Sequence, residues 1–453
     1  MSVTMAGSSK AAARGSLLRV FGLMFALAIA IGTTIGGGIL RTPGEIAALL
    51  PSVYWIFAIW VFGSINALLG AGAFSELGAM LPCAGGPYVF ARRALGDFAG
   101  FFVGYVNSFS NNASTAAIAL VVGEYSATLF PQLAGQTTAV ALSVFLVLVA
   151  LNWVQVRAGG WVQKLTTLAK LLGLGVLVVA AFVMIEPQAS AVAPAPMPQG
   201  VALLAALALA MQAVIFTFDG YYYTVYFGEE LKDPGREIPR GMFRSLYLII
   251  GMYLLLNAAF LWAIPLDQLA HDPFAGGTVA HLLFGFRGDQ LLTLIVVISM
   301  IGVINSGILC GPRILLDMGR DRLCPPQVTR VNRGGTPDVA LLATALVTLA
   351  FLVSGAFDSV LKVTASLMAV LSASMFVCVI VLRKREPDLN RPYRSWGYPW
   401  TTYSGLAIAV AFLVGVMIAD PLHSWIALGL LLATWPVYRA VVMLRDRATS
   451  TKT

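Results

Sequence analysis

Long apolar runs constrain the fold of this chain more than any other feature. The runs at 165–185 and 246–264 are each long enough to cross the hydrocarbon core of a bilayer as a helix. Only 11% of the 453 residues are charged, against about a quarter in an ordinary soluble domain. An outer-membrane barrel would instead show short segments of alternating polarity. The sequence therefore predicts an all-α polytopic membrane protein and excludes a soluble domain.

The apolar runs divide the chain into twelve predicted transmembrane helices. We expect them near residues 17–40, 51–80, 98–128, 137–156, 160–185, 201–230, 241–265, 290–319, 338–357, 360–382, 402–419 and 423–443. The first ten form two sets of five, at 17–185 and 201–383, joined by a Pro/Ala-rich external linker at 186–200. The remaining segments are a cytoplasmic loop with two peripheral helices at 384–444, cytoplasmic tails at 1–16 and 445–453, and an external hairpin or interfacial helix at 271–288.

The basic residues lie between the apolar runs and indicate the orientation. Of the 29 Lys and Arg, Arg41, Arg287 and Lys362 fall on one side of the predicted membrane, Lys170 lies inside a span, and the remainder fall on the other side. Because basic loops stay in the cytoplasm, we expect both termini to be cytoplasmic, in an inner or plasma membrane. The net charge of +8 thus indicates contact with membrane lipids rather than with nucleic acid.

No signature of an enzyme or a metal site is present. The four cysteines show no CxxC spacing, the three histidines do not cluster, and there is no P-loop, HExxH or GxSxG motif. We therefore expect neither catalysis nor a cofactor.

Two predicted helices are interrupted at matching positions. The first contains Gly36, Gly37 and Gly38, and the sixth contains Asp219 and Gly220 beside three tyrosines. Broken helices at corresponding places in two halves indicate a midplane substrate site in an inverted-repeat transporter. The alternative is that the glycines only permit close helix packing. We favour unwinding, because three consecutive glycines are costly to hold in a helix interior.

The two interruptions suit opposite ends of an α-amino acid. Free N–H groups at Gly36, Gly37 and Gly38 would attract a carboxylate, and carbonyls freed around Phe218 and Gly220 would accept an ammonium group. Recognition by backbone groups tolerates many side chains, so we expect broad specificity. The flanking aromatic residues Phe216 and Tyr221 are candidates to close over a substrate, Phe216 the better one, although simple packing is the more common role. Tentative pocket residues on other spans are Asn112, Thr115 and Asn305.

Charged residues within the spans have a functional and a structural interpretation. Lys170 would cost about 2.5–3.5 kcal/mol at mid-membrane, so we expect its ammonium to bridge carbonyls of the unwound first span, where a sodium ion would otherwise bind. The alternative is a side chain that extends to the membrane boundary.

Asp219 is expected to pair with a cationic substrate, to bind a proton, or to cap a helix end, and the sequence does not separate these roles. Glu76 and Glu124 are expected to have structural or interfacial roles.

Several long segments resemble the amino acid, polyamine and organocation (APC) transporter superfamily, most closely its L-amino-acid transporter branch and the bacterial relatives of that branch. They include the motifs Pro-x-Ala-Gly-Gly-x-Tyr and Glu-Glu-x-Lys-x-Pro-x-Arg-x-Ile-Pro, and lie at 36–39, 75–105, 216–242, 311–341 and 382–394. The resemblance implies a leucine-transporter-type fold with a five-plus-five inverted repeat and broken first and sixth helices. It also implies carboxylate-binding amides at Gly36, Gly37 and Gly38, amine-binding carbonyls at Thr34, Phe216 and Asp219, and the fifth-span lysine of sodium-independent members at Lys170.

This resemblance implies a sodium-independent exchanger of neutral amino acids, extended to cationic ones by the Asp-Gly pair of the sixth span. A proton-coupled amino acid symporter, a polyamine/amino acid antiporter and an amino acid sensor that does not transport stay open as alternatives. No cysteine falls in a predicted external loop, so we expect no obligate protein partner. The chain departs from the usual pattern at the triple glycine, at Leu40 and at Arg322.

Overall fold

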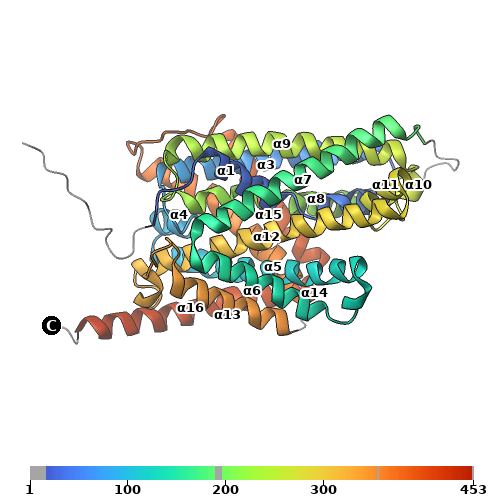
Figure 1. The fold of residues 1–453 in the computed structure, drawn as a ribbon. Coiled ribbons are helices and arrows are strands. Elements are labelled where there is room, and N and C mark those ends of the chain that lie inside the picture. The colour runs from blue at the N-terminus through green and yellow to red at the C-terminus, as the bar shows by residue number, and fades with distance from the viewer. Residues whose placement is uncertain (1–16, 189–195, 355–356, 451–453) are drawn as a thin grey trace, which may run out of the picture.

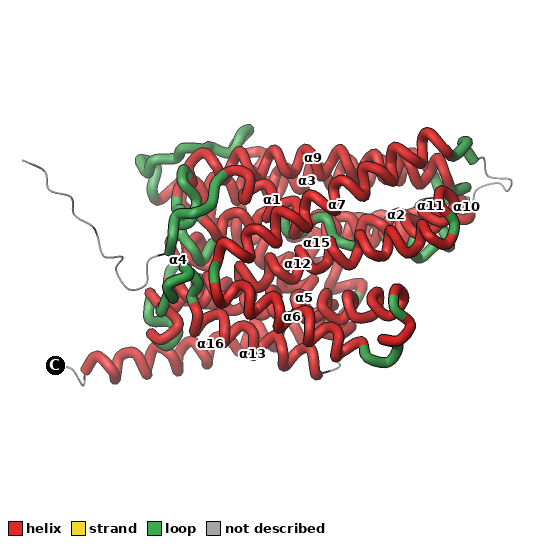
Figure 2. The backbone as a smooth tube through the Cα atoms, viewed as in Figure 1, coloured by secondary structure: helices red, strands yellow, loops and turns green. Residues whose placement is uncertain are grey.

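The protein is a bundle of long helices that run between two ends. The structure, a computed structural model, describes residues 17–188, 196–354 and 357–450. Within those ranges the backbone consists of helices and loops, with one isolated bridge between Phe21 and Leu231 (Figure 2). The all-α prediction is confirmed.

The helices can be followed in chain order in Figure 1. They are α1 (Leu23–Thr34), η1 (Gly38–Leu40), α2 (Thr42–Leu49), α3 (Val53–Met80), α4 (Pro87–Leu95), α5 (Asp97–Leu129), η2 (Pro131–Leu133), α6 (Thr137–Val154), α7 (Val156–Met184), α8 (Val201–Phe218), η3 (Tyr221–Phe227), α9 (Pro234–Ala263), α10 (Leu266–Leu269), α11 (Ala275–Phe284), α12 (Phe286–Arg320), η4 (Pro326–Thr329), α13 (Asp338–Ser354), α14 (Phe357–Arg385), α15 (Trp400–Ala419) and α16 (Pro421–Ser450).

Nine helices of the described ranges are long and apolar enough to cross a membrane. The other three predicted spans correspond to helices that fall short for visible reasons. The first span is divided into α1, η1 and α2; α5 has 33 residues but carries a polar run at 107–115; and α13 has only 17 residues. The protein is therefore a polytopic membrane protein, as predicted.

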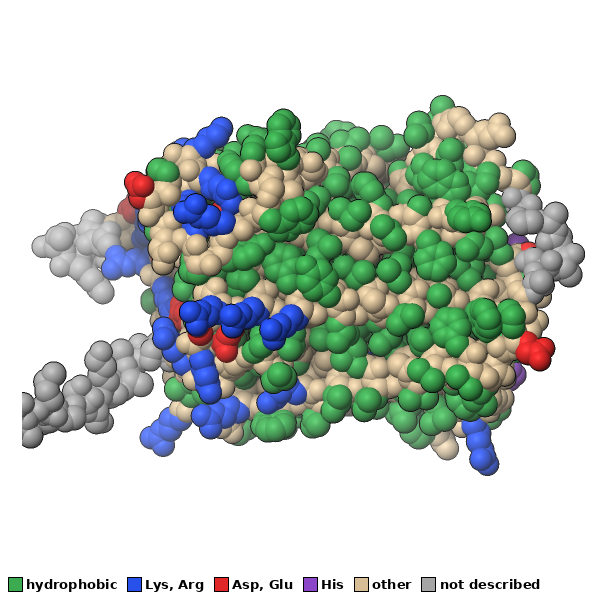
Figure 3. Space-filling view, turned by 90° about the horizontal axis from the view of Figure 1, so that it is seen from above, with side chains coloured by type: hydrophobic (Ala, Val, Ile, Leu, Met, Phe, Trp, Pro, Cys, Tyr) green, Lys and Arg blue, Asp and Glu red, His purple; other side chains and the backbone are tan. Residues whose placement is uncertain are grey.

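The surface and the two ends differ in character. Hydrophobic side chains cover the length of the face seen in Figure 3, and Lys and Arg gather at the end where α4 lies. The helices α10 and α11 lie at the opposite end (Figure 1). The helix α11 falls within the segment 271–288, which was predicted as an external hairpin or interfacial helix. We call these the α4 end and the α10 end.

The interruptions predicted for the first and sixth helices are both present. The helix α1 stops at Thr34 and α8 stops at Phe218, in each case before a short 3₁₀ segment. The two breaks lie against each other, because a Cβ on Gly220 would stand 2.8 Å from Cγ2 of Thr33. Gly220 has φ +109°, a conformation that favours glycine, so the chain can turn away from α8 while remaining this close to α1.

Candidate functional site

Three consecutive backbone donors lie free at the break after α1. The N–H groups of Gly36, Gly37 and Gly38 donate to no backbone carbonyl within the described ranges. A Cβ on Gly36 would meet no atom within 4 Å, so open space adjoins Gly36, whereas a Cβ on Gly37 would stand 2.6 Å from Cε of Met300. Free N–H groups beside open space, at the start of a half-helix, suit an anion such as a carboxylate.

The break after α8 places a carboxylate next to a turn. Asp219 directly follows Phe218, the last residue of α8, and precedes Gly220 at the turn. The N–H of Asp219 donates to the carbonyl of Phe216 at 3.2 Å. Of the carbonyls predicted to bind an amine, that of Phe216 is thus already engaged, whereas that of Asp219 receives no backbone donor in the described part of the chain.

Lys170 reaches the end of α1 from the middle of α7. Its Nζ donates to the carbonyl oxygens of Gly32 at 2.8 Å and Ile35 at 2.6 Å, and to that of Ser299 in α12 at 3.3 Å. The side chain is fully buried, which rules out the alternative in which it extends to the membrane boundary. No carboxylate pairs with it among the ion pairs of the described residues. Three backbone carbonyl oxygens accept from the ammonium, as they would bind a cation.

Tyr253 on α9 also contacts the breaks, and the sequence reading missed it. Its hydroxyl oxygen lies 3.0 Å from the carbonyl oxygen of Thr34 and 3.0 Å from that of Thr217. The side chain is fully buried, and its ring packs edge-on against Trp60. The available signal was a hydroxyl inside the apolar run at 246–264, where a polar group needs a partner.

A cavity adjoins the break after α8 and brings together three predicted site residues. Phe216, Asp219 and Tyr221 all line it, and it holds about 50 Å³. Its other walls come from α3, α14 and α15, with polar side chains at Asn66 and Ser372 and otherwise apolar lining. Asn66 and Ser372 thus supply an amide and a hydroxyl to the lining.

Comparison with known proteins identifies the family. Residues 21–437 match the family model described as amino acid permease. The chain belongs to the amino acid permease family. It is 28% identical over 438 residues to the serine/threonine exchanger SteT of Bacillus subtilis (strain 168), covering 93% of this chain and 96% of that protein. It is 27% identical over 440 residues to the mouse large neutral amino acids transporter small subunit 2, covering 93% of this chain and 81% of that protein. It is 24% identical over 387 residues to the human b(0,+)-type amino acid transporter 1, covering 84% and 79%. Family and relatives are transporters, not enzymes.

The other predicted pocket residues do not line the cavity beside the break after α8. Asn112 and Thr115 line a separate cavity of about 10 Å³ between α5, α6, α12 and α13. Asn305 lines neither cavity: its Nδ2 donates to the Gly159 carbonyl and to Gln163 Oε1, each at 3.0 Å. Its Oδ1 accepts a hydrogen bond from Asn152 at 2.9 Å. Asn305 thus faces α6 and α7.

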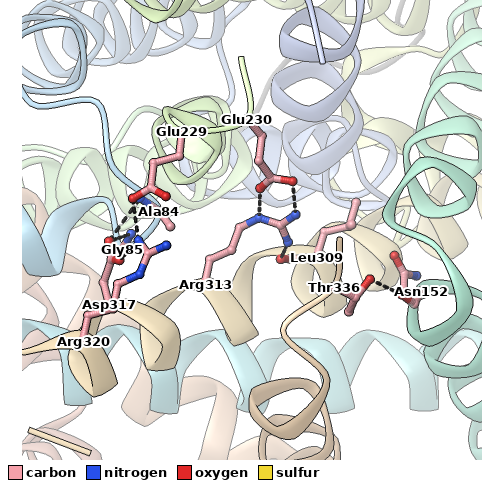
Figure 4. Close-up of polar contacts among 10 residues, drawn as sticks. All are labelled: Ala84, Gly85, Asn152, Glu229, Glu230, Leu309, Arg313, Asp317, Arg320 and Thr336. Atoms are coloured by element: carbon pink, nitrogen blue, oxygen red, sulfur yellow. Dashed lines mark hydrogen bonds and ion pairs between the residues drawn. The ribbon is translucent and has the colours of Figure 1, made fainter. Parts of the chain in front are cut away.

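A buried ion pair joins the loop after η3 to α12. The Glu230 carboxylate binds the Arg313 guanidinium through two contacts of 2.5 and 2.8 Å, and both side chains are nearly inaccessible (Figure 4). Arg313 also donates to the carbonyl of Leu309 and lies over the Phe227 ring, 4.4 Å from its centroid. A buried pair is costly to break by removing one partner, since the other charge then lacks compensation.

A second group of contacts lies at the α4 end of the permease. The Asp317 carboxylate accepts hydrogen bonds from the N–H groups of Ala84 and Gly85, at 3.1 and 2.5 Å (Figure 4). Arg320 bridges Asp317 and Glu229, at 2.8 and 2.6 Å. The helix α12 is thereby joined to the loop after α3 and to the loop after η3. Farther along the same end, Thr336 donates to the carbonyl of Asn152 at 2.6 Å.

Glu76 has a structural environment, in line with the role expected from the sequence. It is 1% exposed and binds Arg383 at 2.6 Å, while Arg391 lies at 3.5 Å. It also accepts a hydrogen bond from the Ser395 N–H at 2.7 Å. Glu76 thus fixes the end of α14 and the following loop against α3.

Proposed function

We propose that this permease exchanges neutral and cationic L-amino acids across the inner or plasma membrane by alternating access, without sodium. The observation that carries the proposal is the position of the Lys170 ammonium on the carbonyls of Gly32 and Ile35, directly before three free glycine N–H groups. A fixed ammonium at this point orders the broken helix without a bound metal ion. The adjoining N–H groups are then held ready for a substrate carboxylate.

The cavity beside Asp219 supports the assignment of the substrate class. Its lining combines a carboxylate, an amide and a hydroxyl, from Asp219, Asn66 and Ser372, with aromatic and aliphatic side chains. Such a lining accepts apolar side chains, and it offers a counter-charge to a cationic one. Serine and threonine exchange, large neutral amino acid transport and b(0,+)-type transport appear in the names of the relatives, and the proposed spectrum is of the same kind.

We assign the α4 end to the cytoplasm because Lys and Arg gather there. Both termini are then cytoplasmic, and residues 17–185 and 201–383 form the two inverted repeats. The contacts of Asp317, Arg320 and the Glu230–Arg313 pair keep the cytoplasmic side closed in this state, and they separate when the site opens inward. The permease is proposed to act without an obligate protein partner.

Counterflow in proteoliposomes tests the proposal. Vesicles are loaded with mixed unlabelled amino acids, and labelled alanine, leucine, arginine or putrescine is supplied outside, with and without sodium. Uptake of labelled amino acid that requires internal amino acid and ignores sodium is the expected result. Uptake that follows an imposed proton gradient with empty vesicles would establish symport instead, and preferred uptake of putrescine would establish polyamine antiport. Saturable binding without flux would leave only the sensor.

A further inference from the structure

A row of arginines follows one face of α9 at intervals of four residues. Arg236, Arg240 and Arg244 are all exposed, whereas the opposite face of the helix, which includes Met242 and Leu246, is buried. Residues four apart lie one above another on a helix, so the three guanidinium groups form a row along its axis. The helix α9 is uppermost in Figure 1, and Figure 3, drawn from that side, shows Lys and Arg reaching from the α4 end onto the hydrophobic face.

Two arginines of this row lack the carboxylate partners that other arginines at the α4 end have. Arg320 and Arg383, for example, each have a carboxylate oxygen 2.6 Å from a guanidinium nitrogen. Arg240 and Arg244 form no ion pair and no side-chain hydrogen bond with any other residue that the structure describes. Like charges one turn apart on a helix are unfavourable, and an anion that both guanidinium groups bind relieves the repulsion.

The nearest acidic residues do not supply this anion. Asp233 lies 3.8 Å from Arg236 in an exposed pair. The Glu237 carboxylate accepts a hydrogen bond from the Asp233 N–H at 3.2 Å, and it thus caps the first turn of α9. Beyond Arg240 the sequence of α9 contains no acidic residue. The two unpaired guanidinium groups therefore face outward without a counter-charge from their own helix.

Beyond the arginines, the same face of α9 is an apolar strip. It includes exposed side chains at Tyr247, Leu248 and Leu255, and a Cβ on Gly251 would meet no atom within 4 Å, so the strip is open there. The 30 residues of α9 extend about 45 Å, which exceeds the hydrocarbon core of a bilayer by about 15 Å. The arginine row extends about 12 Å, so this excess length accommodates it at the level of the lipid headgroups.

We propose that Arg240 and Arg244 bind the phosphate group of an anionic phospholipid, whose acyl chains lie along the apolar strip of α9. Planar guanidinium groups match the oxygens of a phosphate, and at this spacing both reach the same one. A phospholipid supplies the anion and the apolar chains together, whereas a free phosphate or a soluble acidic peptide supplies only the charge. The inference goes beyond the proposed function and does not depend on it, because lipid binding requires no transport.

Arg240→Gln/Arg244→Gln removes both guanidinium groups, and Arg157→Gln/Arg439→Gln is the matched control. Arg157 and Arg439 are also exposed, but they lie on α7 and α16, so the control loses the same charge elsewhere. The apparent dissociation constant of palmitoyl-oleoyl-phosphatidylglycerol is measured by native mass spectrometry on delipidated protein. Palmitoyl-oleoyl-phosphatidylcholine, which has no net charge, is measured in parallel. Thermal unfolding in a neutral detergent checks that each variant is folded.

For Arg240→Gln/Arg244→Gln we expect phosphatidylglycerol to bind about thirtyfold more weakly than to wild type, and for the control variant within about twofold of wild type. Phosphatidylcholine should bind all three proteins equally weakly. Equal affinity for phosphatidylglycerol in wild type and in Arg240→Gln/Arg244→Gln would overturn the site. An equal loss in the two variants would also overturn it, since net charge alone would then explain the binding.

Three further measurements separate this site from general attraction of anions. Arg240→Lys/Arg244→Lys keeps the charge and removes the planar forks, so it should weaken phosphatidylglycerol binding about fivefold; wild-type affinity would overturn the guanidinium assignment. Inorganic phosphate and poly-glutamate, each added in excess, should leave the bound lipid in place, because neither has acyl chains. Displacement by inorganic phosphate would identify a soluble anion as the ligand, displacement by poly-glutamate would identify an acidic peptide, and either would overturn the lipid assignment.

Discussion

Replacement of Lys170 by methionine tests whether the ammonium orders the break after α1. Methionine keeps most of the side-chain volume and removes the charge. The two short contacts, 2.8 Å to Gly32 and 2.6 Å to Ile35, are hydrogen bonds to a charged donor, worth at the lower limit about 1.5 kcal/mol each. Losing about 3 kcal/mol reduces the population of the ordered break about a hundredfold.

Folding should be affected much less than transport. An ammonium at mid-membrane costs about 2.5–3.5 kcal/mol, and its removal returns that free energy to the folded protein. We therefore expect a thermal midpoint close to that of wild type and an initial exchange rate lower by about a hundredfold. The control is Lys164→Met, since Lys164 lies on the same helix but over the exposed Trp161 ring.

The assay is initial counterflow per amount of inserted protein, paired with thermal unfolding of the same preparations. A Lys170→Met rate within threefold of the Lys164→Met rate would refute the reasoning. A marked fall of the thermal midpoint in Lys170→Met together with the fall in transport rate would show a structural role instead.

Three further predictions concern other parts of the molecule. Asp219→Asn should lower arginine exchange about tenfold and leave leucine exchange within twofold, because it removes the carboxylate from the cavity lining. Competition assays with both labels measure this, and equal losses for arginine and leucine would contradict a role of Asp219 in reading side-chain charge. Gly36→Ala should fold normally, since its methyl group meets no atom within 4 Å. It should raise the half-saturation concentration of the substrate about tenfold by occupying the open space. An unchanged half-saturation concentration would place the substrate carboxylate elsewhere. Burial and the nearby Asp317 carboxylate raise the pKa of the Cys83 thiol, so a variant with Cys83 as its single cysteine should react slowly with maleimide. Asp317→Asn in that variant loosens the contact with Ala84 and Gly85 and should speed the reaction. Equal reaction rates with and without Asp317→Asn would show that this contact does not close the α4 end.

The sequence predicted the breaks well, because backbone chemistry is directly visible in residue type. Three consecutive glycines cannot be held cheaply in a helix, and a lysine within an apolar run must find internal partners. The contact of Lys170 with the carbonyls at the end of α1 could therefore be expected before the structure was known. Its role in transport stays a prediction.

Which neighbouring helix each side chain contacts was less predictable. In a span that is apolar on all sides, periodicity does not indicate which face meets which neighbour. Asn305 was a tentative pocket residue of the sequence analysis, and in the structure its side chain bonds to Asn152, Gly159 and Gln163. The same uncertainty concealed Tyr253, whose partners lie on two helices distant in sequence. The pairing of Glu230 with Arg313 likewise depends on how the loop after η3 meets α12, and no local pattern contains that information.

The central claim is that the backbone at the two breaks recognises the α-carboxylate and the α-ammonium of the substrate. Competition against labelled leucine exchange, with leucine, leucinamide and 4-methylpentanoate as competitors, tests it most directly. The three compounds share one side chain, while the amide lacks the carboxylate and the acid lacks the ammonium. The account predicts that leucine competes and that each of the other two is at least about a hundredfold weaker, since either loss leaves charged-group hydrogen bonds unmade. Competition by leucinamide or by 4-methylpentanoate within a few-fold of leucine would contradict it.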